Sequence, residues 1–266
     1  MVSRWTALDP RPVSNSHDIV AQPEVVVRGD DDFRILLVCT ANLCRSPMAQ
    51  FLLEAAVSTA WSGAGQWSVE SAGVLAAENR PMHRQAVTVL AEFGSDGSRF
   101  RSRRLRADML ESADLVLTAT REHRSDVARM HPSVMRRLFT MNQFGYLLAN
   151  APAVHPSTTA RNAGEALIEA AITARGRVRP RSVEDDLDDP VNKPVRAFRH
   201  CAQLLSTNFA QVQRLQSQGG LAGGAGAAGG DVDQVGADRG GHRLGVAAAG
   251  QHPDRPGQVE SDRGQH

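Results

Sequence analysis

Apolar residues along the chain follow two alternating patterns, one typical of buried strands and the other typical of helices. FRILLVC (33–39) is an almost continuous apolar run, as in a strand that is buried on both faces. QWSVESAG (66–73) alternates as a half-buried strand does, and ADLVLTA (113–119) and RRLFTM (136–141) are shorter strand segments. The pattern therefore predicts four strands.

The segments between and after these strands have helical spacing. Ser46 and Pro47 suit the N-cap and first position of a helix, and Gly94 suits the end of one. The predicted helices span 46–61, 81–94, 120–130, 161–176 and 193–216. Strands that alternate with helices predict an α/β fold: a parallel four-stranded sheet with helices on both faces, and a strand–phosphate loop–helix unit at its N-terminal end. Ligands of such sheets bind at the carboxyl ends of the strands.

The two ends of the chain differ from its middle. Residues 1–32 are polar and contain prolines and an acidic cluster, and residues 217–266 are rich in glycine and alanine. Neither end offers enough apolar surface to offset its ordering entropy, so we expect a disordered leader at 1–32 and a disordered tail at 217–266. Residues 33–216 form one predicted domain of ordinary size.

Composition excludes some classes of partner. The chain has 266 residues, of which 41% are hydrophobic, and its 30 basic and 29 acidic residues give a net charge of +1. Such a balance favours neither nucleic acid nor a membrane surface as a partner. The three cysteines cannot form a closed disulfide framework, the first residues lack the apolar core of a signal peptide, and no apolar run spans a membrane. We therefore expect a cytoplasmic protein.

The stretch CTANLCRS (39–46) carries the chemistry that the rest of the sequence lacks. It runs from the end of the first predicted strand into a predicted helix N-terminus, where backbone N–H groups and the helix dipole favour an anion. Arg45 adds a planar guanidinium suited to phosphate oxygens. A thiolate at Cys39 would be favoured by the dipole, by Arg45 and by the Ser46 hydroxyl. The spacing from Cys39 to Arg45 thus predicts a nucleophile that faces phosphorus.

Other polar residues have simpler interpretations. Cys44 is either a buried packing residue or a redox partner that traps oxidised Cys39, and the sequence leaves both open. Cys201 lies within a predicted helix and is expected in the core. No pair of cysteines or histidines near Cys39 and Cys44 has zinc-ligand spacing, so no metal site is expected. The histidines at 83, 123 and 131 are scattered and suit surface or capping roles.

The motif VCTANLCRSPMAQ strongly resembles the signature of the low-molecular-weight protein tyrosine phosphatases, V-C-x-G-N-x-C-R-S-P-x-A-E. The resemblance extends to VESAG (69–73), SRFRSRRL (98–105), ADLVL (113–117) and DDP (188–190), and so covers about 33–216. It implies that Cys39 is the nucleophile, that Arg45 binds phosphate, that Ser46 steadies the thiolate and that Asn42 holds the loop. The residues expected to surround the phosphate are Thr40, Ala41, Asn42, Leu43, Cys44 and Ser46.

The general acid has several candidates in the sequence. EDDLDDP (184–190) offers five carboxylates, and the residues alone do not choose among them. The resemblance implies Asp189, which directly precedes Pro190, because a proline restricts the backbone before it and fixes its direction. Asp189 would protonate the leaving oxygen and then deprotonate the hydrolytic water. No cofactor or metal is required, since Arg45 and the loop N–H groups stabilise the transferring phosphoryl group.

The sequence departs from the family at several positions. Ala41 stands where glycine is usual, so a positive φ there would be strained. Ala77 and Val191 lie where aromatic residues normally flank the phosphotyrosine ring, and Phe100 occupies what is often a histidine of the network that supports the loop. These changes leave the phosphate chemistry intact and question the specificity for aryl substrates.

RFRSRRLR (99–106) places five arginines in eight residues, which is one pattern of a nucleic-acid patch. The near-neutral net charge and the match to a family segment favour a structural role and a place at the substrate rim instead.

The sequence thus predicts a cysteine-dependent phosphomonoesterase, foremost a protein-tyrosine-phosphate phosphatase. Two alternatives remain open: an arsenate reductase that uses an external thiol, and a non-catalytic module that binds a phospholigand. The resemblance implies as substrate a phosphotyrosine protein, a bacterial tyrosine kinase among them, or another phosphomonoester.

Overall fold

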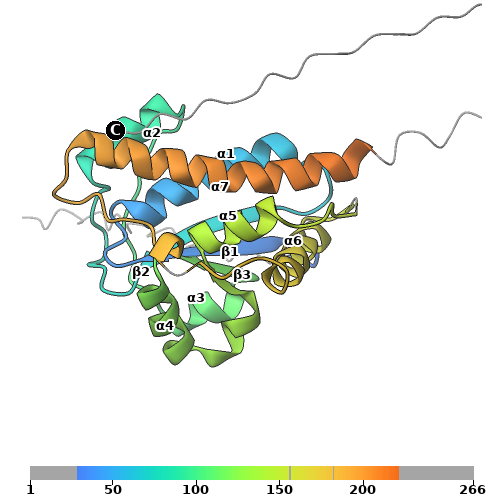
Figure 1. Cartoon of the computed structure of the whole chain (residues 1–266). Helices are drawn as coiled ribbons and strands as arrows, with labels where there is room; N and C mark the ends of the chain where they lie inside the picture. Colours follow the sequence, from blue (N-terminus) through green and yellow to red (C-terminus); the bar gives the residue numbers. More distant parts are fainter. Residues whose placement is uncertain (1–28, 156, 182, 222–266) are drawn as a thin grey trace, which may run out of the picture. The chain divides into compact units, whose positions relative to one another are not determined.

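The computed structural model describes residues 29–155, 157–181 and 183–221 (Figure 1). All of them belong to one compact unit. Its strands are β1 Phe33–Cys39, β2 Trp67–Gly73, β3 Leu115–Thr118 and β4 Leu138–Thr140. Its α-helices are α1 Arg45–Ala60, α2 Arg84–Glu92, α3 Ala107–Ser112, α4 Arg121–Met130, α5 Met141–Ala149, α6 Ala160–Arg175 and α7 Val195–Leu221. Two 3-10 helices, η1 Pro132–Arg137 and η2 Val183–Asp185, complete the described elements.

The four strands form one parallel sheet in the order β2-β1-β3-β4, which confirms the predicted fold class. β1 lies inside the sheet between β2 and β3, and its last residue, Cys39, pairs with Gly73 at the end of β2. A strand with a neighbour on each side is buried on both faces, which explains its nearly continuous apolar sequence. The order of the strands places Cys39 in the middle of the carboxyl edge.

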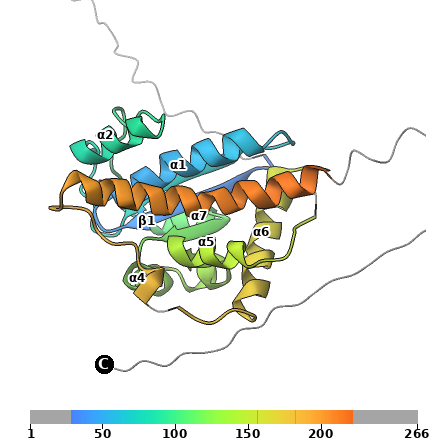
Figure 2. The ribbon, with the colours of Figure 1, turned by 45° about the horizontal axis from the view of Figure 1, so that its top comes forward.

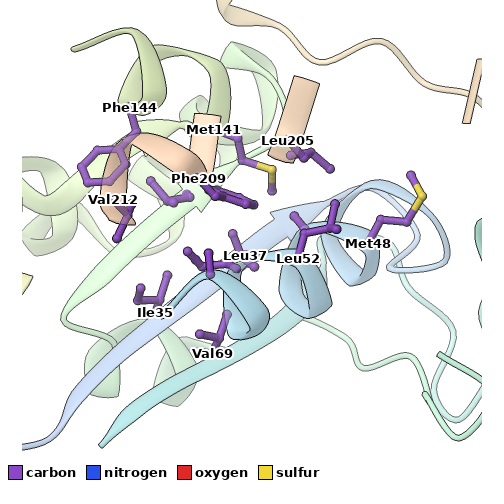
Figure 3. Close-up of a cluster of buried hydrophobic side chains, with 14 of the residues drawn as sticks. Ile35, Leu37, Met48, Leu52, Val69, Met141, Phe144, Leu205, Phe209 and Val212 are labelled. Atoms are coloured by element: carbon purple, nitrogen blue, oxygen red, sulfur yellow. The ribbon is translucent and has the colours of Figure 1, made fainter. Parts of the chain in front are cut away.

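Helices cover both faces of the sheet, as predicted. Alternate side chains of β1 separate to the two faces, because successive residues of a strand point in opposite directions. Ile35 and Leu37 join a large cluster with α1, α5, α6 and α7, whereas Leu36 and Val38 join a smaller one with α3 and α4. Figure 3 shows the large cluster. In Figures 1 and 2, α7 lies alongside α1 over this face.

The predicted strands and helices agree with the structure except at short or weakly patterned elements. α3, with six residues, and α5 were not expected, and the strand expected at 136–141 is shorter because α5 begins at Met141. Gly145 lowers the helical propensity of α5. The structure needs it there, since a Cβ at this position would meet the Asn208 side chain of α7 at 2.5 Å. Close packing of two helices therefore overrides the local preference.

The predicted ends of the domain lie near the limits of the described chain. Residues 29–32 are described, and the Asp32 carboxylate accepts a hydrogen bond from the backbone N–H of Gln66 at 2.8 Å. At the other end α7 runs to Leu221, which is past the predicted boundary at 216. The rest of the predicted leader and tail, 1–28 and 222–266, lies outside the described residues. Among the helices of the described chain, none is both long and apolar enough to cross a membrane.

Candidate active site

The nucleophile predicted from the sequence lies where β1 turns into α1. Cys39 ends β1 and is 2% exposed, and α1 begins at Arg45, one residue before the predicted start. We call Thr40–Cys44, which joins the two elements, the phosphate loop. Among the described residues, no group accepts a hydrogen bond from the backbone N–H of Ala41–Arg45. These N–H groups at the start of a helix are available to an anion.

Asn42 holds the phosphate loop from inside. Its side chain is fully buried and its backbone has a φ of 54°. Its Nδ2 donates to the hydroxyls of Ser46 and Ser71, each at 2.9 Å, and its Oδ1 accepts from the backbone N–H of Arg103 at 2.8 Å. Asparagine tolerates the left-handed region better than most residues. One side chain therefore fixes the loop against both α1 and β2.

The departure at Ala41 does not strain the loop. The described non-glycine residues with a positive φ are Asn42, Asn79 and Asn192, so Ala41 keeps an ordinary backbone conformation. The glycine that the loop does require is Gly73, behind it. A Cβ on Gly73 would meet the carbonyl oxygen of Thr40 at 2.6 Å and the amide nitrogen of Asn42 at 2.8 Å. Backbone packs on backbone here, which only glycine allows.

The Ser46 hydroxyl lies against the Cys39 thiol. The distance from Sγ to Oγ is 3.0 Å, and Ser46 is fully buried. Since Asn42 donates to Ser46 Oγ, the serine proton is free to bond Cys39 or the more distant carbonyl of Ala72 at 3.3 Å. A donated hydrogen bond from Ser46 stabilises a thiolate at Cys39.

Arg45 is the cation of the site, and its side chain is 7% exposed. Its Nη2 donates to the carboxylate of Asp189 at 2.6 Å and to the Thr40 hydroxyl at 3.1 Å. Its Nη1 donates to the carbonyl of Leu187 at 3.3 Å. The guanidinium thus joins the phosphate loop to the segment that carries Asp189, across more than 140 residues of sequence.

The structure separates the two adjacent aspartates of the DDP motif. Asp189 faces Arg45, whereas the Asp188 side chain is 91% exposed and lies 3.8 Å from Lys193. The Asp189 carboxylate is 46% exposed and also accepts from the backbone N–H of Val191 at 3.1 Å. Of the two, Asp189 alone lies where a proton could pass to a group bound beside Arg45.

The segment Asp186–Val191, here called the acid loop, is fixed by neighbouring elements. The backbone N–H of Leu187 donates to the carbonyl of Ala119, after β3, at 2.8 Å. The Asp186 carboxylate pairs with Arg121, the first residue of α4, at 3.0 Å. Asn142 of α5 donates to the carbonyl of Asp186 at 3.1 Å. Hydrogen bonds to the loop's own backbone, together with the Arg121–Asp186 ion pair, therefore set the position of the acid loop.

His123 is a residue of the site that sequence reasoning missed. It is 5% exposed, and its Nε2 lies 2.8 Å from the Thr40 hydroxyl while its Nδ1 lies 2.7 Å from Thr120. Burial, together with the positive charge of Arg45, lowers the pKa of His123 below its usual value. The ring is therefore neutral at pH 7 and bridges the phosphate loop to α4. Its place five residues after a strand was the available signal.

The other two cysteines are buried thiols. Cys44 is 3% exposed, and burial, reinforced by the charges of Asp189 and Cys39, raises its pKa far above the ordinary value. Cys201 lies in α7, as expected, and burial raises its pKa to about 12. Both are protonated at neutral pH, and a protonated thiol is a poor nucleophile. Of the three cysteines, Cys39 is the one that lies at the end of β1, directly before the phosphate loop.

The arginine-rich segment supports the loop through its backbone. Besides the bond from Arg103 to Asn42, the carbonyl of Arg103 accepts from Gly73 at 3.0 Å. Phe100 is buried and packs edge-on against Phe51, so it makes no polar contact with the loop. Ser71, bonded to both Asn42 and Gln50, supplies polar support instead. These contacts give 99–106 a structural role.

Apolar side chains lie exposed beside the loop. Leu75 is 68% exposed, and its backbone N–H donates to the carbonyl of Thr40 at 2.9 Å. Val191, next to the acid loop's proline, is 40% exposed. Leu75 was not predicted from the sequence as a site residue. The available signal was its position two residues after Gly73, at the carboxyl end of β2. Within the described part of the chain, no group of three or more His, Cys, Asp and Glu residues is placed to hold a metal.

The chain matches a known family and several of its members. The family model described as low molecular weight phosphotyrosine protein phosphatase matches residues 34–151. Over 109 residues the chain is 36% identical to a probable low molecular weight protein-tyrosine-phosphatase, EpsP, of Ralstonia solanacearum, covering 41% of this chain and 70% of that protein. Over 112 residues it is 38% identical to a protein-arginine-phosphatase of Geobacillus stearothermophilus, covering 42% and 71%.

Solved structures show the same fold. The YwlE arginine phosphatase from Geobacillus stearothermophilus superposes with a TM-score of 0.51 at 27% identity, over 72% of this chain and 97% of that one. A low molecular weight protein tyrosine phosphatase from T. tengcongensis gives a TM-score of 0.50 at 28% identity, over 68% and 97%. Cys39 and Arg45 lie within the residues that the family model matches, whereas Asp189 lies beyond them.

Proposed function

The chain belongs to the low molecular weight phosphotyrosine protein phosphatase family and is a cysteine-dependent phosphatase, and from that premise we propose that Cys39 attacks phosphorus while Asp189 handles the proton. One observation carries the proposal. The Cys39 thiol lies 3.0 Å from the Ser46 hydroxyl, and the guanidinium of Arg45, the first residue after the phosphate loop, lies 2.6 Å from the Asp189 carboxylate. Nucleophile, cation and acid therefore meet at a single loop.

The first step transfers the phosphoryl group to sulfur. The Cys39 thiolate forms an S–P bond as the bond from phosphorus to the ester oxygen breaks, and the protonated Asp189 gives its proton to the leaving oxygen. The N–H groups of Ala41–Arg45 and the Arg45 guanidinium hold the other three phosphate oxygens. The products are the free alcohol or phenol and a cysteinyl phosphate.

The second step returns the enzyme to its starting state. Asp189, now a carboxylate, takes a proton from a water molecule whose oxygen attacks phosphorus, and the S–P bond breaks to release phosphate. The Ser46 hydroxyl stabilises the departing Cys39 thiolate, since Asn42 already occupies the serine oxygen as a donor. The buried network around Asn42 therefore serves the hydrolytic step as well as the attack.

We propose phosphotyrosine as the substrate rather than phosphoarginine, although relatives named for each activity match the chain. The exposed side chains of Leu75 and Val191 supply an apolar rim that suits an aromatic ring. A phosphoarginine would place a cationic group at the same rim, where both nearby carboxylates already have partners: Asp189 pairs with Arg45 and Asp188 with Lys193. A phosphotyrosine protein, a bacterial tyrosine kinase among them, fits this rim.

The two alternative functions receive less support. Arsenate reduction with an external thiol would use the same loop and Cys39, but the matching relatives are named as phosphatases, which favours phosphoryl transfer. A non-catalytic module was suggested by Ala41, whose backbone is free of strain. We also propose that the protein works in the cytoplasm, because a catalytic thiolate persists best in a reducing compartment.

The test compares matched substrates and matched cysteine variants. Wild type should hydrolyse a phosphotyrosine peptide at least about tenfold faster than the phosphoarginine peptide of the same flanking sequence, as measured by kcat/KM, the scale set by one well-matched pocket contact. Cys39→Ser should abolish hydrolysis of both, and Cys44→Ser, which removes the neighbouring thiol, should retain it. Undiminished turnover by Cys39→Ser would exclude the mechanism, and a preference for phosphoarginine would exclude the substrate.

A further inference from the structure

A hollow separate from the candidate active site lies among α4, α5, α6 and the segment that leads to η2. Its volume is about 250 Å³, and its walls include Arg124, Gln143, Tyr146, Arg175, Arg179 and Asp185. None of these residues contributes a side-chain contact to Cys39 or Arg45. Arg175, Arg179 and Asp185 also lie beyond residue 151, where the family match ends. We call this hollow the arginine pocket.

Positive charge exceeds negative charge in the arginine pocket, because four arginines line it beside one carboxylate, Asp185. Arg124 and Arg175 both donate to the same amide oxygen, Oε1 of Gln143, at 3.3 and 3.5 Å. In the described part of the chain, no carboxylate lies within ion-pairing distance of Arg124, Arg175 or Arg179. Desolvation and the charge of Arg124 lower the pKa of Arg175, and the carboxylate of Asp185 offsets only part of this effect. Two guanidinium groups that converge on one neutral oxygen repel each other, and an anion between them would relieve that repulsion.

The same pocket contains a buried carboxylate oxygen without a partner. Asp185 is 4% exposed, and its Oδ2 accepts from Nε2 of Gln143 at 3.3 Å. Its Oδ1 is buried and has no hydrogen-bond partner among the described residues. Buried polar groups in native proteins are almost always bonded, so an orphan oxygen in a cavity wall points to a ligand that donates to it.

The two features define the chemistry of the ligand. The excess of arginines over carboxylates favours an anion, and a phosphate dianion matches the forked geometry of a guanidinium. Oδ1 of Asp185 requires a donor on the same molecule, which a hydroxyl supplies. The volume equals that of about eight water molecules, which admits a small metabolite and excludes a folded partner. Tyr146 adds an aromatic wall, with the guanidinium of Arg181 3.9 Å from its ring centre.

We propose that the arginine pocket binds a small hydroxylated phosphate monoester, with its phosphate held by Arg124, Arg175 and Arg179 and its hydroxyl bonded to Oδ1 of Asp185. Asp185 ends η2, and the acid loop begins at the next residue. Asn142 of α5 donates to the carbonyls on both sides of Asp185, those of Glu184 and Asp186. The bound ligand would therefore lie directly beside the anchor of the acid loop.

The chain contains one tyrosine, which gives the pocket a reporter of its own. Full-length protein labelled with 3-fluorotyrosine has a single fluorine resonance, from Tyr146. Glycerol 3-phosphate is titrated into labelled Arg45→Ala protein, in which phosphate binding at the active site is disabled. We expect a saturable shift of the resonance with a Kd of about 1 mM or lower, as for a small charged ligand. No saturable shift would overturn the proposal.

Matched variants and a matched ligand complete the test. In the Arg45→Ala background, Arg124→Gln and Arg175→Gln should each weaken binding at least tenfold, whereas Arg177→Gln, on the same segment outside the pocket, should not. Ethyl phosphate, which lacks a hydroxyl, should bind several-fold more weakly than glycerol 3-phosphate, and Asp185→Ala should remove that difference. Equal binding of glycerol 3-phosphate by the three arginine variants would overturn the assignment. So would equal affinities of the protein for inorganic phosphate, titrated as a further ligand, and for glycerol 3-phosphate. The pocket variants are also made with Arg45 intact. Wild-type rates of phosphatase turnover in these proteins verify that the substitutions leave the fold unchanged.

Discussion

The phosphate loop and the acid loop meet at one guanidinium, yet the protein holds them in different ways. Buried side chains hold the phosphate loop from inside: Asn42 and Ser46 are fully buried and bond each other. Distant elements hold the acid loop from outside, mainly by its own backbone: the carbonyl of Ala119 accepts from the Leu187 N–H, and the side-chain amide of Asn142 donates to the Asp186 carbonyl. The charged side chains of the two regions also differ in exposure. The side chain of Arg45, which directly follows the phosphate loop, is 7% exposed, whereas that of Asp189 in the acid loop is 46% exposed.

This difference suits the two tasks. The phosphate loop must present fixed charges and N–H groups to a transition state, and a preorganised site is most effective when it is buried and rigid. The acid loop must deliver a proton to a leaving group of variable shape and then to water, which requires solvent access. The comparison predicts that damage to the phosphate loop lowers both stability and turnover, whereas damage to the acid loop lowers turnover alone.

The largest expected effect is on the guanidinium that the two loops share. Arg45→Lys keeps the charge but loses the fork that bonds Thr40, Leu187 and Asp189. We expect kcat to fall by about 10³, the scale for loss of an oxyanion donor. Steady-state kinetics on a phosphotyrosine peptide measure it. Arg106→Lys, at an exposed pair with Asp108, is the control and should stay near wild type. A kcat for Arg45→Lys within tenfold of wild type would contradict the account.

The acid loop is tested by its two adjacent aspartates. Asp189→Asn removes the acid and should lower kcat by about 10²–10⁴, the usual contribution of general acid–base catalysis. The loss should be smaller with p-nitrophenyl phosphate, whose leaving group needs less protonation. Asp188→Asn, at the exposed neighbour, should change kcat little. The free energy of unfolding should barely change in either variant, and an equal loss of kcat in both would refute the assignment of Asp189.

The phosphate loop is tested at Asn42. Asn42→Ala removes three hydrogen bonds, two of them fully buried, and leaves the backbone N–H of Arg103 without a partner. The free energy of unfolding should fall by about 2–3 kcal/mol, and kcat by one to two orders of magnitude. Asn79→Ala is the matched control, since Asn79 has a φ of 59° but an exposed side chain, so it isolates the backbone strain. Equal losses of stability in the two variants would show that the buried network contributes nothing.

The smallest expected effect concerns His123 and pH. Because the fold lowers the pKa of His123, the unfolded chain binds more protons, and stability declines as pH falls below the unfolded value of about 6.5. Denaturant titrations across pH 5–8 should show this slope in wild type and a weaker one in His123→Gln. KM should rise a few-fold in the variant at neutral pH through the loss of the Thr40 contact. An unchanged slope would contradict the role of His123.

The same contrast explains what could be read from the sequence. The phosphate loop needs particular side chains at fixed spacing, so Cys39, Asn42, Arg45 and Ser46 were visible as one contiguous motif. The acid loop is fixed through backbone groups, which every residue has, and only the proline after Asp189 marked it. The four strands followed from apolar runs, but α5 did not, since the contact between Gly145 and Asn208 that requires its glycine is tertiary.

Residues that reach the site from other elements were the hardest to predict. His123 contacts Thr40 from α4 and Leu75 contacts it from beyond β2, and their positions shortly after strand ends were the only signals of that approach. The orphan oxygen of Asp185 and the convergence of Arg124 and Arg175 on Gln143 likewise exist only in three dimensions. The strain expected at Ala41 was absent because Asn42 alone of the two takes the left-handed conformation.

The central claim is that Cys39 carries the phosphoryl group between the two steps. Wild-type protein and Cys44→Ser are mixed with a phosphotyrosine peptide, quenched in the pre-steady state and mapped by mass spectrometry. The account predicts up to one phosphoryl group per molecule, on the peptide that contains Cys39, in both proteins and in neither case on Cys44 or Cys201. Phosphate on another residue, or turnover by wild type with no phosphorylated Cys39 at any quench time, would contradict it.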